Sequence, residues 1–180
     1  MSWKTVALEH VPATPWRNGG GSTRELLAWP GAADWQLRIS VAEVERDGPF
    51  SSFPGIERWF AVLEGAGVEL ALAGVQHRLT PDSAPLRFDG AAPAYCTLLA
   101  GATRDLNLMA LPGRARLQRA AGRQRLTWEA GRLVALYAPR APAMLDDLPL
   151  PAATLAWRIA HAPGAAALAC EQAWWMEVSL

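Results

Sequence analysis

Alternation of apolar and polar residues with a period of two most constrains what this chain can fold into. The pattern is clearest over residues 35–42, where Arg38 and Ser40 fall on the polar side, and it recurs over residues 68–73, 106–110 and 155–159. Such alternation is typical of strands with one face on a core and the other face polar. Glycine and proline separate the runs at short intervals, as in sandwiches and barrels. The sequence therefore predicts an all-β protein with few or no helices.

The segment from Arg58 to Phe88 gives the most detailed architectural prediction. We expect four strands there, over residues 58–64, 67–73, 75–79 and 86–88, separated by glycine- or proline-containing turns. The order of strand, Leu-Glu-Gly turn, strand, glycine turn and strand resembles the core of a cupin jelly roll. A jelly roll closes two sheets over a cavity. This half of the chain is therefore expected to contain a pocket.

The second half has the same strand-rich character without a detectable repeat. Strands are expected near residues 123–128, 132–137, 154–159 and 174–180, a helical turn or a loop in the alanine-rich residues 164–173, and a loop over residues 144–151. We therefore expect a bicupin, meaning two jelly-roll-like β-barrel halves that form one compact unit. The N-terminal cupin-like half would span residues 1–110 and hold the pocket, and a degenerate cupin-like half would span residues 111–180.

Charge and cysteine content limit the partners and the compartment. The 180 residues carry 17 basic and 17 acidic side chains, which argues against nucleic acid or an anionic membrane as a partner. Two cysteines do not make a disulfide framework, and Cys96 lies in an apolar run as a core residue would. The first residues contain no apolar secretory segment, and no apolar stretch approaches the roughly 18 residues of a membrane span. We expect a reduced, soluble, cytoplasmic protein.

Residues 15–25, with the sequence PWRNGGGSTRE, form the most unusual segment. Consecutive glycines lose much conformational entropy on folding, so they are kept where the backbone turns with positive φ or approaches another group closely. With Arg17 and Asn18 beside them, that group could be an anionic or polar ligand. A tight loop between two strands, with Arg17 solvated, explains the segment equally well.

The sequence contains few of the residues that a metal site or nucleophilic catalysis would require. A cupin usually holds its metal through a His-x-His pair, a glutamate and a later histidine, whereas the three histidines here are His10, His77 and His161. Phe50, Ser51, Ser52 and Phe53 occupy the place of the His-x-His pair. No Gly-x-Ser-x-Gly elbow or phosphate-binding loop occurs. We therefore predict no metal and no other cofactor, and we assign no catalytic residue.

Arginine, amide and hydroxyl side chains near turns remain as candidates for a binding site. An arginine fork matches a carboxylate in bidentate fashion, and Asn107 interrupts an otherwise apolar run, where a buried amide must be hydrogen-bonded. The alternative is that each arginine pairs with a structural acid, for example Arg58 with Glu57 or Glu69. The predicted ligand-binding residues are Arg17, Asn18, Arg38, Ser40, Phe50, Ser52, Phe53, Arg58, Phe88 and Asn107.

Five sequence blocks resemble the HutD/Ves family, and they stand in the expected order within residues 1–110. They are PWRNGGGSTRE at 15–25, LRISVA at 37–42, DGPFSSFPGIER at 47–58, FDG at 88–90 and GATRDLNLM at 101–109. The resemblance implies a two-jelly-roll cupin fold without a metal. It also implies an association with histidine utilisation or a stress response, and a regulatory role that senses an intermediate such as urocanate or formylglutamate.

Our leading hypothesis is a metal-free cupin that binds a small carboxylate. Arg17 and Arg38 would hold the carboxylate, with hydrogen bonds from the amides and hydroxyls and apolar walls from the phenylalanines. A metal-independent enzyme, similar to cupin isomerases or epimerases, is the alternative, with Glu57 or Asp89 as general base. A third possibility is an interaction module with a homodimer through the C-terminal half, suggested by its tryptophans, Trp128, Trp174 and Trp175.

Overall fold

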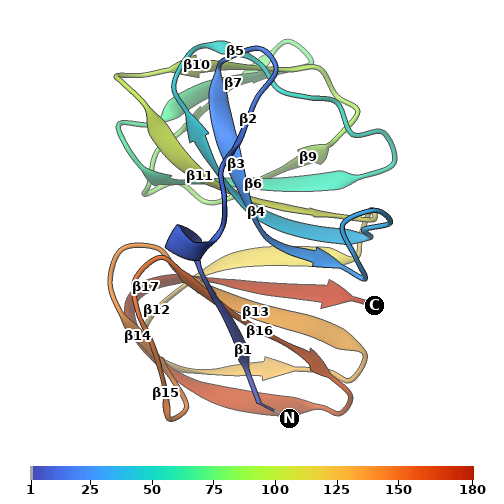
Figure 1. The fold of residues 1–180 in the computed structure, drawn as a ribbon, viewed down its shortest axis with the longest axis vertical. Coiled ribbons are helices and arrows are strands. Elements are labelled where there is room, and N and C mark those ends of the chain that lie inside the picture. Colours follow the sequence, from blue (N-terminus) through green and yellow to red (C-terminus); the bar gives the residue numbers. More distant parts are fainter. Residues whose placement is uncertain (1) are drawn as a thin grey trace. The chain divides into compact units, whose positions relative to one another are not determined.

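The computed structural model describes residues 2–180 and confirms an all-β fold (Figure 1). In the described part of the chain, the strands are accompanied by one helical element, the short 3-10 helix η1 (Leu8–His10). Two compact units can be distinguished. The N-terminal unit is Pro12–Gly113, and the C-terminal unit joins residues 2–11 to Arg114–Leu180. Of the half expected over residues 1–110, residues 2–11 thus belong to the C-terminal unit.

Two antiparallel sheets build the N-terminal unit. The six-stranded sheet has the order β2-β3-β4-β11-β6-β9, and the four-stranded sheet has the order β5-β10-β7-β8. The strands of the first sheet are β2 (Thr14–Pro15), β3 (Gly21–Trp29), β4 (Leu37–Val44), β11 (Thr103–Ala110), β6 (Glu57–Glu64) and β9 (Leu86–Asp89). Those of the second are β5 (Gly48–Pro49), β10 (Ala94–Leu98), β7 (Val68–Leu72) and β8 (Val75–Leu79). The strands predicted between Arg58 and Phe88 are therefore confirmed.

Strand register decides which side chains of the six-stranded sheet share a face. Ser40 of β4 lies opposite Asn107 of β11, and Asn107 lies opposite Phe60 of β6. In the next row, Arg38 pairs with Met109, and Met109 pairs with Arg58. Because side chains alternate along a strand, these two rows project from the same face. The residues that alternate with these rows on β4 and β11 are buried and apolar, namely Ile39, Val41, Leu106 and Leu108, whereas Trp59 of β6 is partly exposed.

An apolar cluster fills the part of the N-terminal unit beyond the polar rows. It includes Phe60 and Val62 of β6, Val68 and Leu70 of β7, and Cys96 of β10. The Cys96 side chain is fully buried, which confirms the expectation of a core cysteine. The cluster therefore adjoins the two rows at Phe60, which belongs both to the cluster and to the first row.

A seven-stranded antiparallel sheet forms the C-terminal unit. Its order is β1-β16-β13-β17-β14-β15, and β12 pairs with β17. The strands are β1 (Lys4–Ala7), β12 (Ala115–Trp128), β13 (Arg132–Ala138), β14 (Ala143–Leu145), β15 (Leu148–Leu150), β16 (Thr154–Ala160) and β17 (Gly164–Ser179). Trp128 and Trp175 lie in its core cluster, and Trp174 is also buried. These tryptophans therefore do not form an exposed patch.

Two local predictions for this unit are wrong. The alanine-rich residues 164–173 are neither helical nor a loop but lie in β17, where Ala167 pairs with Arg125 and Ala169 with Met144. Pairing on both sides overrides the helix preference of alanine, which is only a weak determinant. Residues 144–151 were expected as a loop, but β14 and β15 form a hairpin there. Proline is tolerated in β15 because β15 is an edge strand.

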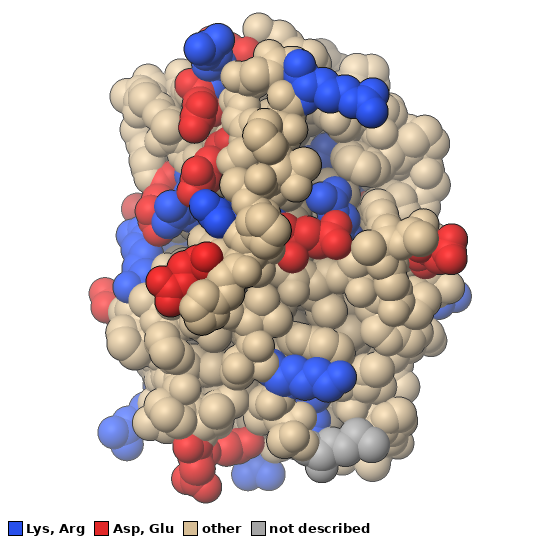
Figure 2. All heavy atoms as spheres, viewed as in Figure 1, with Lys and Arg blue, Asp and Glu red and all other residues tan. Residues whose placement is uncertain are grey.

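The surface shown in Figure 2 carries basic and acidic side chains interspersed among each other.

The described residues contain no long apolar helix of the kind that crosses a bilayer.

Candidate functional site

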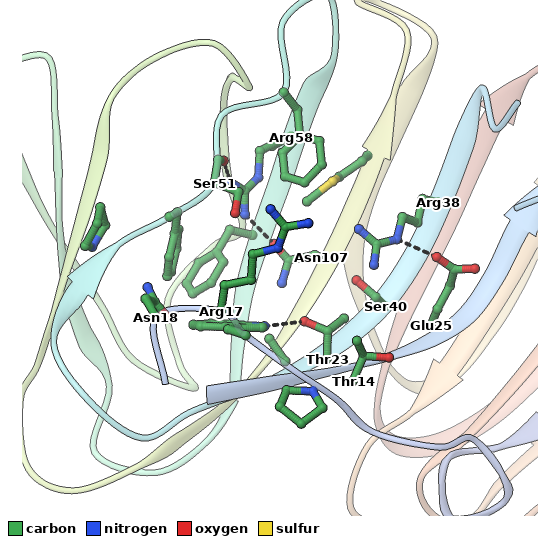
Figure 3. Close-up of a pocket in the computed structure, with 18 residues that line it drawn as sticks. Thr14, Arg17, Asn18, Thr23, Glu25, Arg38, Ser40, Ser51, Arg58 and Asn107 are labelled. Carbon is green, nitrogen blue, oxygen red and sulfur yellow. Dashed lines mark hydrogen bonds and ion pairs between the residues drawn. The ribbon is translucent and has the colours of Figure 1, made fainter. Parts of the chain in front are cut away.

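A pocket of about 800 Å³ opens in the N-terminal unit (Figure 3). Strands β2, β3, β4, β5, β6 and β11 and the segments before β3 and after β5 contribute its walls. Eight predicted site residues line it: Arg17, Asn18, Arg38, Ser40, Phe50, Phe53, Arg58 and Asn107. Ten further residues complete the lining: Thr14, Pro15, Trp16, Thr23, Glu25, Ala42, Pro49, Ser51, Phe60 and Met109. A cup with a cationic and amide-bearing wall is thus present in this unit.

Arg58 is the most enclosed cation of the pocket, with 5% of its surface exposed. Its Nη2 donates to Asn107 Oδ1 at 2.9 Å, and its Nη1 donates to the Ser51 carbonyl oxygen at 3.3 Å. The buried Nε has no hydrogen-bond partner, and no ion pair joins Arg58 to a carboxylate among the described residues. Burial, and secondarily the charge of Arg38, lowers the pKa of Arg58 to about 10. A charged guanidinium is therefore held by neutral acceptors alone.

Three phenylalanine rings surround the Arg58 guanidinium. Its Cζ lies 5.3 Å from the ring centre of Phe50, 5.6 Å from that of Phe53 and 5.1 Å from that of Phe88. Cation–π contacts of this kind stabilise a cation by about 0.5–2 kcal/mol, depending on its desolvation. The rings thus exclude water from Arg58 while offering it no full negative charge.

Arg38 and Glu25 form the ion pair of the pocket. Arg38 Nε donates to Glu25 Oε2 at 2.7 Å, and the side chains are 20% and 36% exposed. The two residues lie on the adjacent strands β4 and β3, and an irregularity in the register follows Glu25. The sequence interpretation did not select Glu25. Glu25 and Thr23 are two residues apart, so they project from the same face of a strand, and both line the pocket. This spacing was the sequence signal that could have identified Glu25.

The glycine run serves a close approach of two backbones. A Cβ atom on Gly21 would lie 2.1 Å from the carbonyl oxygen of Glu43, so only glycine fits there. Gly19 has a φ of +68°, and the Gly20 N–H donates to Asn18 Oδ1 at 3.0 Å. This part of the segment is therefore the tight loop that was one of the two alternatives. The same loop carries the exposed side chain of Arg17 to the rim of the pocket.

Two predicted site residues and both predicted general bases lie outside the lining. Ser52 is exposed and its neighbour Ser51 takes the lining position, while Phe88 contacts Arg58 from outside the pocket wall. Glu57 accepts hydrogen bonds from Trp59 Nε1 and the Gly113 N–H, at 3.3 and 3.4 Å. Asp89 accepts one from the Ala91 N–H at 2.9 Å. Both carboxylates are thus engaged in local structural contacts.

The donor atoms of the pocket do not suit a metal. Among the lining residues, the only carboxylate is Glu25, which is paired with Arg38, and none is a histidine. Across residues 2–180, no three His, Cys, Asp or Glu side chains cluster as metal ligands. We therefore derive no chemistry through a metal.

A buried carboxyl group lies one row beyond the pocket wall. Asp105 precedes Asn107 by two residues on β11 and pairs in register with the lining residue Ala42. Its Oδ2 accepts a hydrogen bond from Thr103 Oγ1 at 2.8 Å, and its Oδ1 is buried without a partner. Burial raises the pKa of Asp105 to about 7, although the Thr103 hydrogen bond opposes the change. The group is thus partly neutral near neutral pH.

Sequence comparison places most of the chain in one family. Residues 8–167 match the family model described as HutD. An uncharacterized 21.2 kDa protein in the hutC 3' region of Pseudomonas putida is 41% identical over 123 residues, which cover 66% of this chain and 64% of that protein. Protein Ves of Citrobacter koseri is 39% identical over 107 residues, covering 57% and 54% respectively. The matches thus span between half and two thirds of these relatives.

Solved structures show the similarity over nearly the whole chain. The structure of HutD from Pseudomonas fluorescens SBW25 (formate condition) has a TM-score of 0.91 and 29% identity, and the match covers 99% of this chain and 98% of that one. Protein YlbA from Escherichia coli, of family DUF861, has a TM-score of 0.74 at 9% identity, covering 99% and 90%. The latter likeness concerns the fold alone, which is cupin-like.

Proposed function

The chain belongs to the HutD family, and from that premise we propose that its N-terminal unit binds a small carboxylate. The observation that carries the proposal is the Arg58 guanidinium, which is buried, charged and held only by neutral acceptors. A buried charge without a counter-charge is costly, and pairing with an anion removes much of that cost. A bound carboxylate would supply the missing negative charge.

Hydrogen-bond capacity supports a carboxylate at Arg58. Guanidinium has five N–H donors, and the contacts to Asn107 and Ser51 use two of them. The remaining donors include Nε–H, which has no protein partner. The planar fork suits two oxygens of a carboxylate. Arg17, exposed at the rim, is placed to add a second, more weakly held contact.

The walls and size of the pocket favour a ligand with an apolar body. Trp16, Phe50, Phe53, Phe60 and Met109 line it beside the polar groups, which is the usual composition of small-molecule sites. The volume of about 800 Å³ is far larger than a one-carbon carboxylate such as formate would fill, which favours a larger ligand. We propose urocanate and formylglutamate as candidate ligands, and a role as a regulator or sensor linked to histidine utilisation. The name of the Pseudomonas putida relative, which refers to a hutC region, supports that link.

Calorimetry tests the proposal directly. Urocanate, formylglutamate and glutamate are titrated into the wild-type protein and into Arg58→Met, with Arg78→Met on the exposed face of β8 as the control for losing one positive charge. We expect one of the three ligands to bind with sub-millimolar affinity, and Arg58→Met to weaken it at least about 30-fold, as for a lost charge-assisted pair. If no ligand binds below millimolar concentration, or if both variants weaken binding equally, the proposal fails.

A metal-independent enzyme is the second candidate, and one observation favours it. Glu25 places a carboxylate in the pocket, and a general base must lie within hydrogen-bond reach of its substrate. The reaction would be removal of a proton from a carbon of the bound carboxylate and its return. Incubating candidate ligands in D₂O and following deuterium incorporation by NMR distinguishes the two roles. Exchange that Glu25→Gln abolishes supports the enzyme, and binding without exchange supports the sensor.

We also propose that the two units are the two jelly-roll-like halves of a bicupin. The pairing of a six-stranded and a four-stranded antiparallel sheet in the N-terminal unit supports this for that half. For the C-terminal unit, the support is its seven-stranded antiparallel sheet around a tryptophan-rich core. A homodimer and a cytoplasmic location stay predictions.

A further inference from the structure

We propose that Glu25 acts as a charge filter, which restricts the pocket to ligands carrying a single negative charge. This inference rests on the proposed binding of a carboxylate at Arg58 and narrows the class of carboxylate. Of the two candidate ligands, it favours urocanate, which carries one carboxylate, over formylglutamate, which carries two. It starts from the position of Glu25 beside Arg38 and near Ser40, among the side chains that line the pocket (Figure 3).

Glu25 is fixed in the pocket by its surroundings. It stands in the middle of β3 and pairs in register with Ser40 of β4, which also lines the pocket. Its Oε2 accepts the Arg38 Nε–H at 2.7 Å, a short, charge-assisted hydrogen bond. The carboxylate is therefore held beside Arg38 at the pocket wall, where a ligand meets it.

The charges of the lining residues leave one enclosed cation uncompensated. The ionisable lining residues are Arg17, Glu25, Arg38 and Arg58. Glu25 offsets Arg38, and Arg17 is exposed at the rim, where water and salt screen its charge. The positive charge of Arg38 also repels that of Arg58, and this repulsion contributes to the lowered pKa of Arg58. One ligand carboxylate at Arg58 therefore neutralises the inner part of the pocket.

A second ligand carboxylate that reached the Arg38 side of the pocket would meet Glu25. If Arg38 turned to bind it, Glu25 would lose its partner, and if Arg38 stayed, the two carboxylates would repel each other. Like charges brought together across an interface cost several kcal/mol. Selection against a competitor by such a repulsive group is a common source of specificity. The pocket therefore favours monocarboxylates and rejects dicarboxylates of the same shape.

Two isosteric probes measure the effect of the second charge alone. N-formylglutamate is a dianion at neutral pH, and N-formylglutamine replaces its side-chain carboxylate by an amide of the same size. Both are titrated calorimetrically into the wild-type protein, Glu25→Gln and Glu69→Gln. Glu69 lies on β7 outside the pocket, so its substitution removes one negative charge from the protein without touching the site.

We expect the wild-type protein to bind N-formylglutamine at least about tenfold more tightly than N-formylglutamate. Glu25→Gln should reduce that ratio to near one or reverse it, because Arg38 becomes free for the second carboxylate, while Glu69→Gln keeps the wild-type ratio. Arg38→Gln is the complementary variant: it leaves Glu25 uncompensated, so both probes should bind at least about tenfold more weakly. Melting temperatures of all variants verify that they fold.

Three results would overturn the inference. They are a ratio near one in the wild-type protein, a ratio that Glu25→Gln leaves unchanged, and an equal change in Glu69→Gln. If neither probe binds to the wild-type protein or to Glu25→Gln, the substitution has had no effect on selectivity, and the inference is overturned as well. Urocanate binding to the same samples, and its loss in Arg58→Met, judges the proposed function separately, so the two failures can be distinguished.

Discussion

Arg58 Nη2 donates a hydrogen bond to Asn107 Oδ1 at 2.9 Å, and both side chains are almost completely buried. The bond joins β6 to β11 and gives the guanidinium a neutral acceptor where a carboxylate could have stood. This choice of acceptor keeps the positive charge of the pocket available. It also supplies the first prediction, because a single atom exchange converts the amide into an acid.

Asn107→Asp should abolish binding of carboxylates while preserving the fold. The new carboxylate would occupy the acceptor position and neutralise Arg58 from within, so that a ligand gains little from the guanidinium. We expect affinity for a bound carboxylate to fall at least about 100-fold, a loss of roughly 3 kcal/mol, with a melting temperature no lower than wild type. Gln76→Glu on the exposed strand β8 adds the same charge elsewhere and should bind as wild type does. Wild-type affinity in Asn107→Asp would contradict the assigned role of Arg58.

Asp105→Asn should change how stability depends on pH. Burial raises the pKa of Asp105 from 3.8 to about 7, so the folded state binds its proton more tightly than the unfolded state. The stability it contributes is complete below pH 3.8 and is lost as pH rises to about 7. The loss is of the order of 4 kcal/mol. Relative to wild type, Asp105→Asn should therefore gain stability as pH rises from 3.8 to about 7, and it should keep that gain at higher pH.

Denaturant unfolding at several pH values measures this difference. Asp82→Asn, at an exposed position, is the matched control and should leave the pH dependence as it is in the wild-type protein. An identical pH dependence in wild type and Asp105→Asn would show that the buried carboxyl titrates normally.

Gly21→Ala should destabilise the N-terminal unit strongly. The added Cβ would lie 2.1 Å from the Glu43 carbonyl oxygen, so β3 and β4 would have to separate at that point. We expect a loss of roughly 3 kcal/mol, at the upper end of overpacking costs. Gly31→Ala is the control, because nothing lies within 4 Å of its Cβ position. A wild-type melting temperature for Gly21→Ala would contradict the close backbone approach.

Cys96 should resist thiol reagents until the protein unfolds. The side chain is fully buried, and burial, aided by the charges of Asp105 and Asp47, raises the pKa of Cys96 to about 12. Little thiolate is therefore present, and no reagent reaches it. Labelling at pH 8 followed by mass spectrometry should find Cys96 unmodified in native protein and modified in denaturant. Rapid native labelling of Cys96 would refute its burial.

Period-two alternation was sufficient to predict the fold class and most strands of the N-terminal unit. It also placed Arg38, Ser40 and Asn107 on polar sides of their strands, and all three line the pocket. The alternation failed for β17, because a run of alanines has no polar face and its strand pairing comes from residues far away in sequence. Hairpin β14/β15 was missed because Pro142, Pro149 and Pro151 indicated a loop.

The partners that side chains of the site find on neighbouring strands could not be predicted from the sequence. Glu25 was not among the predicted site residues, whereas register brings it to Arg38, thirteen residues away. Arg58 was expected beside Glu57 or Glu69, yet its partners are Asn107 and the backbone of Ser51. Adjacent residues on a strand point to opposite faces, so sequence neighbours are poor predictions of partners. Ser51 lines the pocket and Ser52 does not, but neither lies in a strand, so alternation gave no guide to choosing between them.

Because the hydrogen-bond acceptors of Arg58 are neutral, the choice of buffer affects any measurement of ligand affinity for this protein. A guanidinium that lacks an internal counter-ion will accept whatever small anion the solution supplies, including acetate, chloride or formate. Each such ion would compete with the proposed carboxylate ligand, so that the apparent dissociation constant of that ligand would rise with the concentration of the ion. Affinity here is thus a joint property of the protein and its buffer, and values obtained in different salts become comparable only after extrapolation to zero competitor.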